Sequence, residues 1–374
     1  MQFVNRILSI GFAGHLGRFG SLTRPDRKIV LPPVRETFWL PRTADILKPN
    51  LIRLMKKSAA LLLTLASLAL FQSAHAAALF PVVVNGRWGY MDKSGTAVAN
   101  AQFDQAETFS AGLGAVRLGR WGYVDMSGKL NINPQFDKAG TFSDGLAVVQ
   151  LGGRYGYINP EGKYAINPQF DAAGSFSQDR AAVKVARLYG YIDKSGTLAI
   201  NPQFAEAGAF SEGLACVKLG KVFGYVDTAG KVVINPQFEN AEAFSEGLAA
   251  FRMAKRWGFM DKAGKIVINP QFDAVHRFVN GLAPVQVGKL WGFADAAGKL
   301  VVNPQFDHAD AFSEGLARVR MGGRWGFVDK TGKFAINPQF DEAESFADGL
   351  ARVKLERKTG YVDASGKYVW TPTN

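Results

Sequence analysis

An aromatic residue followed by glycine recurs along this chain at a nearly constant interval. Eight copies of the pair begin at Trp88, Trp121, Tyr155, Tyr189, Phe223, Trp257, Trp291 and Trp325, and Thr359-Gly360 holds the ninth place. Successive spacings are 33 residues once and then 34 residues seven times. A fixed period of this length indicates one supersecondary unit per copy, each burying its apolar face against its neighbours. No other feature restricts the possible folds as much.

One copy, residues 316–349, predicts a three-stranded antiparallel meander. Residues 316–321 alternate in polarity, and the Gly-Gly at 322–323 is a tight-turn signal. A second alternating strand follows, and the Asp-Lys-Thr-Gly sequence at 329–332 has the composition of another hairpin turn. Residues 334–336 make the third strand, which the next proline is expected to end.

The remainder of the copy predicts a short helical turn that connects one meander to the next. Phe340, Ala343 and Phe346 are spaced three residues apart, which places them on one side of a helical turn. Asp341 suits the N-cap of such a turn, and Gly349 suits the position after its end. We therefore predict an all-β fold, a tandem array of nine meanders at residues 77–374 linked by short helical-turn connectors.

Two arrangements suit this array: an open, solenoid-like stack and a closed β-propeller. The first copy begins with its own first strand and the last copy ends with its own third strand, so no unit needs to be split between the termini. The terminal copies also depart from the repeat, since Ala101 stands in place of the proline and Thr359 replaces the aromatic residue. Such departures are typical of capping units, so we predict the open, twisted stack, with the closed propeller as the alternative.

Residues 55–76, MKKSAALLLTLASLALFQSAHA, have the three parts of a secretory signal peptide. Two lysines precede the apolar run at 59–71, which is short for a membrane anchor, and an A-x-A cleavage site ends at Ala76. Because a signal peptide normally opens a chain, we interpret residues 1–54 as an over-extended gene prediction. The mature protein is then expected to be periplasmic or secreted, without a membrane span.

The charge of the chain does not favour a nucleic-acid partner. The formal charge is +12, but residues 1–76 contain 11 Lys and Arg against 3 Asp and Glu and so carry +8 of it. The repeats are thus only weakly basic, and export would separate them from chromosomal DNA. The single cysteine, Cys216, excludes an intrachain disulfide.

The aromatic residues of the repeat are predicted to form its core. Each aromatic of the pair shares a strand face with the aromatic two residues later, and the glycine between them allows another backbone to approach. A stacking platform for a ligand is the lesser alternative. We predict that the eight aromatic-glycine positions named above are structural.

These residues resemble the WG-repeat (KWG-repeat) family of bacterial proteins. The match is to the pattern W-G-[YF]-[VIM]-D-x-x-G-K-x-x-I-N-P-Q-F-D-x-A-x-x-F-S-x-G-L-A, and it spans residues 79–374. The resemblance implies a β-rich repeat module that acts in interactions or in the cell envelope. It carries over no catalytic residue and no known ligand.

The repeats show no recognisable catalytic motif. We find no phosphate-binding loop, no serine elbow and no paired carboxylates. His276 and His308 are the two histidines after residue 76, with Asp307 and Asp310 nearby; a metal site is one interpretation, but two solvated loop histidines are simpler. We therefore expect no enzyme, no metal and no cofactor, and we interpret Cys216 as an inert thiol.

A basic residue stands one or two positions before the aromatic in every copy. Solvated turns with some ion pairs are the plainer interpretation of this pattern. The alternative is a basic ribbon whose polyanion contacts are Arg87, Arg120, Arg154, Arg256 and Arg324. The leading hypothesis is an exported, non-enzymatic scaffold for protein or cell-envelope partners; the alternative function is binding of cell-wall glycan or an anionic envelope polymer.

Overall fold

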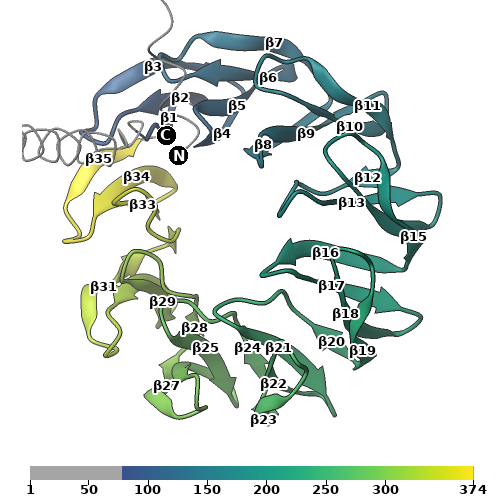
Figure 1. Ribbon diagram of the computed structural model, residues 1–374. Helices are drawn as coiled ribbons and strands as arrows, with labels where there is room; N and C mark the ends of the chain where they lie inside the picture. Colours follow the sequence, from purple (N-terminus) through teal and green to yellow (C-terminus); the bar gives the residue numbers. More distant parts are fainter. Residues whose placement is uncertain (1–77, 374) are drawn as a thin grey trace, which may run out of the picture. The chain divides into compact units, whose positions relative to one another are not determined.

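Nine small antiparallel sheets follow one another around a ring in the computed structural model (Figure 1). The structure describes residues 78–373, so the predicted signal peptide and residues 1–54 lie outside the described part. The first sheet has three strands and each of the other eight has four, hydrogen-bonded in chain order. The prediction of an all-β array of nine copies is confirmed, and no helix occurs among the described residues.

Each four-stranded blade runs outward from the centre of the ring to its rim (Figure 1). The inner strands are β4 (Gln105–Ser110), β8 (Lys138–Ser143), β12 (Ala172–Ala173), β16 (Glu206–Ser211), β20 (Asn240–Ala241), β24 (Ala274–Val275), β28 (His308–Ala309) and β32 (Glu342–Ala343). The second strands are β1 (Phe80–Val84), β5 (Leu113–Leu118), β9 (Leu146–Leu151), β13 (Ala181–Val185), β17 (Leu214–Leu219), β21 (Leu248–Met253), β25 (Leu282–Val287), β29 (Ala317–Met321) and β33 (Leu350–Leu355).

The third strands carry the aromatic-glycine pair, and the fourth strands form the rim. The third strands are β2 (Arg87–Met91), β6 (Arg120–Asp125), β10 (Arg154–Ile158), β14 (Leu188–Ile192), β18 (Val222–Asp227), β22 (Arg256–Asp261), β26 (Leu290–Asp295), β30 (Arg324–Val328) and β34 (Lys358–Asp363). The rim strands are β3 (Ala97–Phe103), β7 (Leu130–Phe136), β11 (Tyr164–Phe170), β15 (Leu198–Phe204), β19 (Val232–Phe238), β23 (Ile266–Phe272), β27 (Leu300–Phe306), β31 (Phe334–Phe340) and β35 (Tyr368–Thr373).

The predicted helical-turn connector is wrong, because that segment is the inner strand of the next blade. In β4, β8 and β16 the pairing with the second strand shifts register between the alanine and the phenylalanine, as at Ala207 and Phe210. A bulge adds one residue to the two-residue period of a strand, so alanine and phenylalanine can be three apart and still share a face. Asp348 and Gly349 then form a hairpin turn with φ of 53° and 86°, where helix termination was predicted.

The rim strands continue through the proline that was expected to end them. Trp325 pairs with Phe340 and Phe327 with Ile336, so the rim strand holds two extra residues at Asn-Pro-Gln. Proline lacks an N–H to donate, and a bulge on an edge strand is a place where none is required. The glycine after Trp325 allows this close approach, since a Cβ there would lie 2.6 Å from the carbonyl oxygen of Ile336.

The ring closes, so the preferred open stack is wrong and the alternative, a closed nine-bladed propeller, is correct. Phe80 and Tyr361 lie in edge-to-face contact with ring centroids 5.6 Å apart. Thr373 donates a hydrogen bond to the carbonyl oxygen of Val83, with an oxygen–oxygen distance of 2.5 Å. No blade is split, as predicted, but packing between whole blades closes the ring without a shared sheet. The atypical residues of the last copy, Thr359 and Trp370, lie at this seam rather than at a free end of the array.

The hydrophobic core lies between neighbouring blades. One cluster joins Phe327 and Ile336 of the eighth blade to Phe346 and Val353 of the ninth, and equivalent clusters recur around the ring. A single blade therefore cannot bury its apolar face alone, which explains the tandem repetition. In the part of the chain that the structure describes, no helix is long and apolar enough to cross a membrane.

Candidate functional site

The two aromatic positions of the repeat have different surroundings. The aromatic two residues after each pair begins is buried in every blade, with an exposure of 0% at Tyr157 and 4% at Tyr361. The first aromatic of the pair is half-buried in seven blades, and Trp291 alone among the eight is buried. Seven of the eight predicted core aromatics therefore flank the core rather than fill it, and they leave part of each ring accessible, whereas Trp291 is buried.

Buried tyrosine hydroxyls tie each tyrosine-containing blade to the next. The hydroxyl of Tyr123 donates to the carbonyl oxygen of Gly140 at 2.7 Å, and that of Tyr157 donates to Gly174 at 2.7 Å. At the seam, Tyr361 donates to Pro81 at 2.8 Å. Burial raises the pKa of these tyrosines above its ordinary value, which keeps the hydroxyl protonated as a donor. Nothing in the single repeat showed that this hydroxyl reaches across a blade junction.

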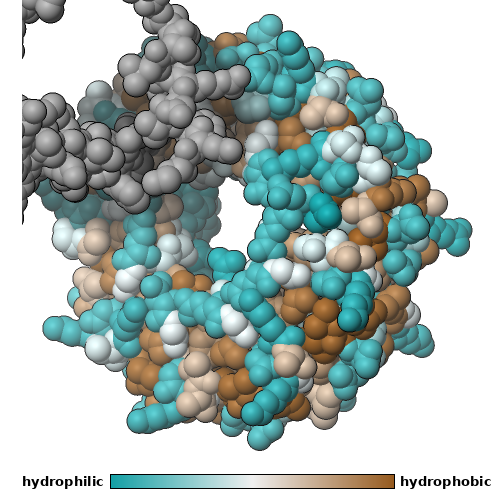
Figure 2. Space-filling view, in the orientation of Figure 1, coloured by the Kyte–Doolittle hydropathy of each residue, from teal (hydrophilic) through white to brown (hydrophobic). Residues whose placement is uncertain are grey.

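In the first eight blades, the residue 17 places after this buried aromatic is the acceptor of the tyrosine bond or its equivalent, and we name these eight residues the inner row. Its members are Glu107, Gly140, Gly174, Gly208, Glu242, His276, Asp310 and Glu344. The backbone N–H of an inner-row residue donates to the carbonyl oxygen eight residues later, as in His276 to Pro284 and Glu344 to Arg352. The inner strands face the centre of the ring, where Figure 2 shows an opening. The backbone hydrogen bond is thus the same from blade to blade along the inner row, whereas the side chain differs.

The five arginines predicted to contact polyanions are paired with aspartates. Each pairs with the aspartate 17 residues later, at the start of the next blade: the partners are Asp104, Asp137, Asp171, Asp273 and Asp341. The nitrogen–oxygen distance is 2.5 Å for Arg256 and 2.9 Å for Arg324. Four of these aspartates, Asp104, Asp137, Asp273 and Asp341, also accept from a turn amide, as Asp104 does from Gly119 at 2.8 Å. The basic turns and the acidic connectors therefore largely neutralise one another.

The ninth blade breaks the repeat and contains a pocket. Thr359 stands where the other blades carry an aromatic residue, and a pocket of about 420 Å³ lies beside it. Trp325 and Trp88 line this pocket from the neighbouring blades. The Arg318 guanidinium lies 4.8 Å from the centre of the Trp325 ring, and that of Arg352 lies 5.6 Å from Trp88. Two indole rings and two guanidinium groups therefore line the pocket beside Thr359, at the place where the other blades carry an aromatic side chain.

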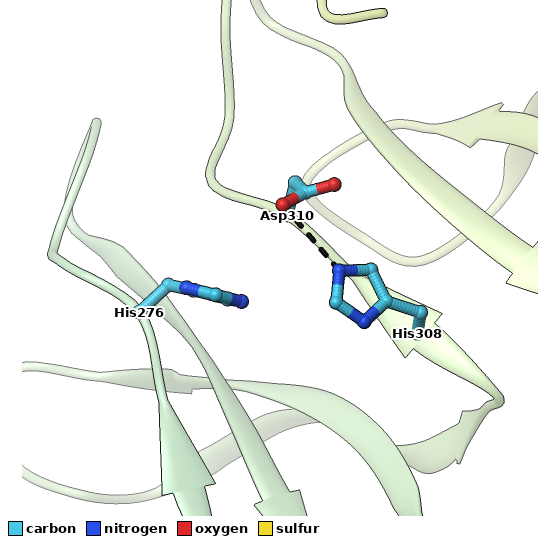
Figure 3. Close-up of side chains that lie close together, drawn as sticks. All are labelled: His276, His308 and Asp310. Carbon is cyan, nitrogen blue, oxygen red and sulfur yellow. Dashed lines mark ion pairs between the residues drawn. The ribbon is translucent and has the colours of Figure 1, made fainter. Parts of the chain in front are cut away.

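The two histidines of the repeats, predicted as solvated, lie together with Asp310 (Figure 3): His308 is on the inner strand β28, Asp310 directly follows it, and His276 directly follows the neighbouring inner strand β24. The Nε2 atom of His308 lies 3.5 Å from Asp310 Oδ1. His276 stacks on Trp291 with ring centroids 4.9 Å apart and planes 13° apart. Burial lowers the pKa of His276. Asp307, the other carboxylate near them in sequence, instead accepts from the Gly323 amide at 3.4 Å.

Cys216 has the environment of an inert thiol. It is buried, and its Sγ lies 3.3 Å from the carbonyl oxygen of Ala241 in the next blade. Burial raises the pKa of this thiol to about 12, so the nucleophilic thiolate is scarce at neutral pH.

Nine repeated blades around a closed ring define this molecule as a repeat β-propeller. The model of the WG containing repeat matches the sequence at residues 88–120, 121–155, 155–186, 189–222, 223–256, 257–291, 291–325 and 325–358. The chain therefore belongs to the WG-repeat family, as the sequence pattern predicted. A search of curated proteins found no match.

Matches to solved structures are at low sequence identity. A crystal structure of the eukaryotic initiation factor matches with a TM-score of 0.57 and 11% identity, over 78% of this chain and 95% of that one. Kluyveromyces lactis Hsv2p matches with a TM-score of 0.40 and 10% identity, over 60% and 91% of the two chains. The dihydro-heme d1 dehydrogenase NirN matches with 0.44 and 13%, over 80% and 74%. At such identities the likeness to the initiation factor concerns the fold alone, and the other two support no argument.

Proposed function

We propose that this protein is an exported, non-enzymatic scaffold that binds protein or cell-envelope partners through the inner row of its ring. The observation that carries this proposal is the chemical variation of the inner row on an unvarying backbone. Three successive blades present Gly140, Gly174 and Gly208, and the following four present Glu242, His276, Asp310 and Glu344. A closed ring of many small contacts suits binding in which each contact is weak and the sum is strong.

Site-specific photo-crosslinking in the producing cell tests the scaffold function. A photoreactive residue at Glu107 or Glu344, both exposed, is expected to give adducts of discrete mass with a protein partner. Val267 on the rim strand β23 is the control, because it is 43% exposed and lies away from the inner row. Identical adducts at all three positions, or none at the two glutamates, would contradict this function.

Export rests on the sequence of residues 55–76, which has the charge, apolar run and cleavage site of a signal peptide. Fractionation of the producing cell, with mass spectrometry of the N-terminus, is expected to find a chain that begins at Ala77 in the periplasm or the medium. A cytoplasmic chain that still contains residues 55–76 would overturn export and leave the ring's binding role standing. The proposal of a non-enzymatic role rests on the sequence of the repeats, which contains no recognisable catalytic motif.

Binding of a cell-wall glycan is the second candidate, and the pocket beside Thr359 favours it. Indole faces stack on sugar rings, and polar groups around them fix orientation. Envelope glycan fragments are expected to change tryptophan fluorescence, and Trp88→Leu or Trp325→Leu should weaken the effect while Trp121→Leu should not.

The variant with all five paired arginines changed to serine tests the anionic-polymer form of this function. Because those arginines are paired with aspartates, we expect little change in its retention on heparin as salt rises.

A further inference from the structure

We propose that His276, His308 and Asp310 bind one divalent transition-metal ion, Zn²⁺ in preference to Ca²⁺ or Mg²⁺, between the seventh and eighth blades (Figure 3). One ligand atom from each residue lies within 4.8 Å of the other two. Tetrahedral zinc with bonds of about 2.0–2.2 Å places two ligand atoms about 3.4 Å apart. The His308 Nε2 to Asp310 Oδ1 distance, 3.5 Å, already fits one edge. A small movement of His276 toward the other two completes the triangle.

The Nε2 atom of His276 supplies independent support. It is buried, and it has no hydrogen-bond partner among the described residues. A buried polar atom without a partner is unfavourable, and such atoms in native proteins call for an explanation such as an ion. Trp291 holds the imidazole plane by stacking, and the ring of His308 lies 5.8 Å from that of His276. A metal ion between the two rings would satisfy the orphaned nitrogen.

Arg318 orients the carboxylate of this site. Its Nε donates to Asp310 Oδ2 at 2.5 Å, and its Nη1 donates to the carbonyl oxygen of Ala343. These contacts leave Asp310 Oδ1 directed at His308, in the manner of the outer hydrogen bonds that orient metal ligands. The guanidinium also places a positive charge near the ion, which opposes tight binding.

The ligand set decides the class of metal and leaves room for a further ligand. Two imidazoles and one carboxylate suit zinc and its late transition-metal neighbours, whereas calcium and magnesium require more oxygen ligands. A cavity of about 580 Å³, lined by His276, Asp310 and Glu242 among others, adjoins the site. Three protein ligands leave a fourth position for water or for a group from a partner. This metal site goes beyond the scaffold function and does not depend on it.

Calorimetric titration of the metal-free full-length protein with Zn²⁺ tests the site. We expect one saturable Zn²⁺ per chain, and at least tenfold weaker binding in His276→Gln and in His308→Gln. Glu107→Gln is the matched control, since it changes the same inner-row position in another blade, and it should bind as the wild type does. Unchanged thermal midpoints of the metal-free variants would show that they fold.

Imidazole NMR resonances provide the second readout. Both His276 and His308 resonances should move as Zn²⁺ is added, with assignments taken from the two glutamine variants. The proposal is overturned if the wild type shows no saturable binding, if either variant keeps the wild-type affinity, or if only one of these imidazoles responds.

Discussion

Six blades carry a tyrosine and three consecutive blades carry a phenylalanine at the same buried position of the third strand. Each tyrosine hydroxyl donates to a backbone carbonyl of the next blade, as Tyr157 does to Gly174. Phe259, Phe293 and Phe327 have no such donor. The residue 17 places after each of them is, in turn, His276, Asp310 and Glu344. The phenylalanine blades thus precede the part of the inner row with the most varied chemistry.

The aromatic packing between neighbouring blades is the same in the tyrosine blades and the phenylalanine blades. The two groups differ in the polar contact across the blade junction. Tyr157 and Phe176 have ring centroids 4.8 Å apart, and the equivalent rings of Phe259 and Phe278 lie 4.7 Å apart. At the junction after Phe327, a charged side chain makes part of the link, since Arg318 contacts both Asp310 of its own blade and the Ala343 carbonyl of the next blade. The comparison teaches that apolar stacking sets the ring, and that polar groups at the junction can change without changing the fold.

The largest expected effect is a loss of stability on replacing the glycine of the aromatic-glycine pair, and it should be equal in the tyrosine blades and the phenylalanine blades. In Gly156→Ala the new Cβ would lie 2.5 Å from the Ile166 carbonyl oxygen, and in Gly326→Ala 2.6 Å from that of Ile336. Because the obstructing atoms are backbone, we expect each change to destabilise the protein by about 3 kcal/mol. Thermal and urea denaturation measure this, with Gly174→Ala as the control, since its nearest atom is 3.8 Å away. A large difference between the two blades would contradict a shared framework.

Arg318 is expected to matter more than a neighbouring surface arginine. Arg318→Leu removes donors from Asp310 and from the Ala343 carbonyl, so we expect a loss of about 2 kcal/mol in the free energy of unfolding. Arg320→Leu, at an exposed position two residues later, should stay within about 0.5 kcal/mol of the wild type. Equal losses in the two variants would mean that the junction after Phe327 does not rely on this charged link.

Exchanging tyrosine and phenylalanine at the buried position should change the stability less, and in opposite directions in the two groups of blades. Tyr157→Phe leaves the Gly174 carbonyl without its donor and is expected to destabilise by about 1 kcal/mol. Phe293→Tyr places a hydroxyl toward the equivalent carbonyl, that of Asp310, and should be neutral or mildly stabilising. Denaturation midpoints of both variants check this. If Tyr157→Phe has no effect, the hydroxyl bond does not contribute to the junction.

The smallest expected effect is on the acid sensitivity of stability, to which the turn aspartates of tyrosine blades and phenylalanine blades should contribute alike. The Ser127 hydroxyl lowers the pKa of Asp125, and the Thr331 hydroxyl lowers that of Asp329. A carboxyl whose pKa is lower in the folded state stabilises the fold fully above its unfolded pKa, here 3.8, and loses this contribution as pH falls through the folded value. Asp125→Asn and Asp329→Asn should each slightly reduce the fall in thermal midpoint between about pH 6 and about pH 3. An unchanged fall in both would show that other groups control acid stability.

The strands and their hairpin turns could be predicted from the sequence because their signals are local. Alternating polarity located β29, and the glycines at 323 and 332 have the positive φ, 82° and 84°, that the turns required. The inner strand was missed because a bulge gives it the three-residue spacing of a helical turn. Closure was predicted only as the alternative, because it depends on the small rotation between successive blades, which no single residue encodes.

The histidine cluster was only partly visible in the sequence. His276 and Asp310 are 34 residues apart, one period, so stacked blades must place them at equivalent points of neighbouring inner strands. That signal was present and could have brought these residues together. The burial of the His276 Nε2 atom and its lack of a partner could not be predicted, since they depend on how Trp291 packs.

Closure of the ring is the claim on which the circular inner row, the pocket beside Thr359 and the seam depend, and methyl NMR tests it directly. Val82 and Met91 of the first blade form one buried cluster with Leu350 of the ninth. In protein with labelled Val, Leu and Met methyl groups, we predict nuclear Overhauser effects from Leu350 to Val82 or Met91. An open stack separates these residues by the length of the array. Absence of these effects, with all three methyl groups assigned and Leu350 accessible to a soluble paramagnetic probe, would contradict the closed propeller.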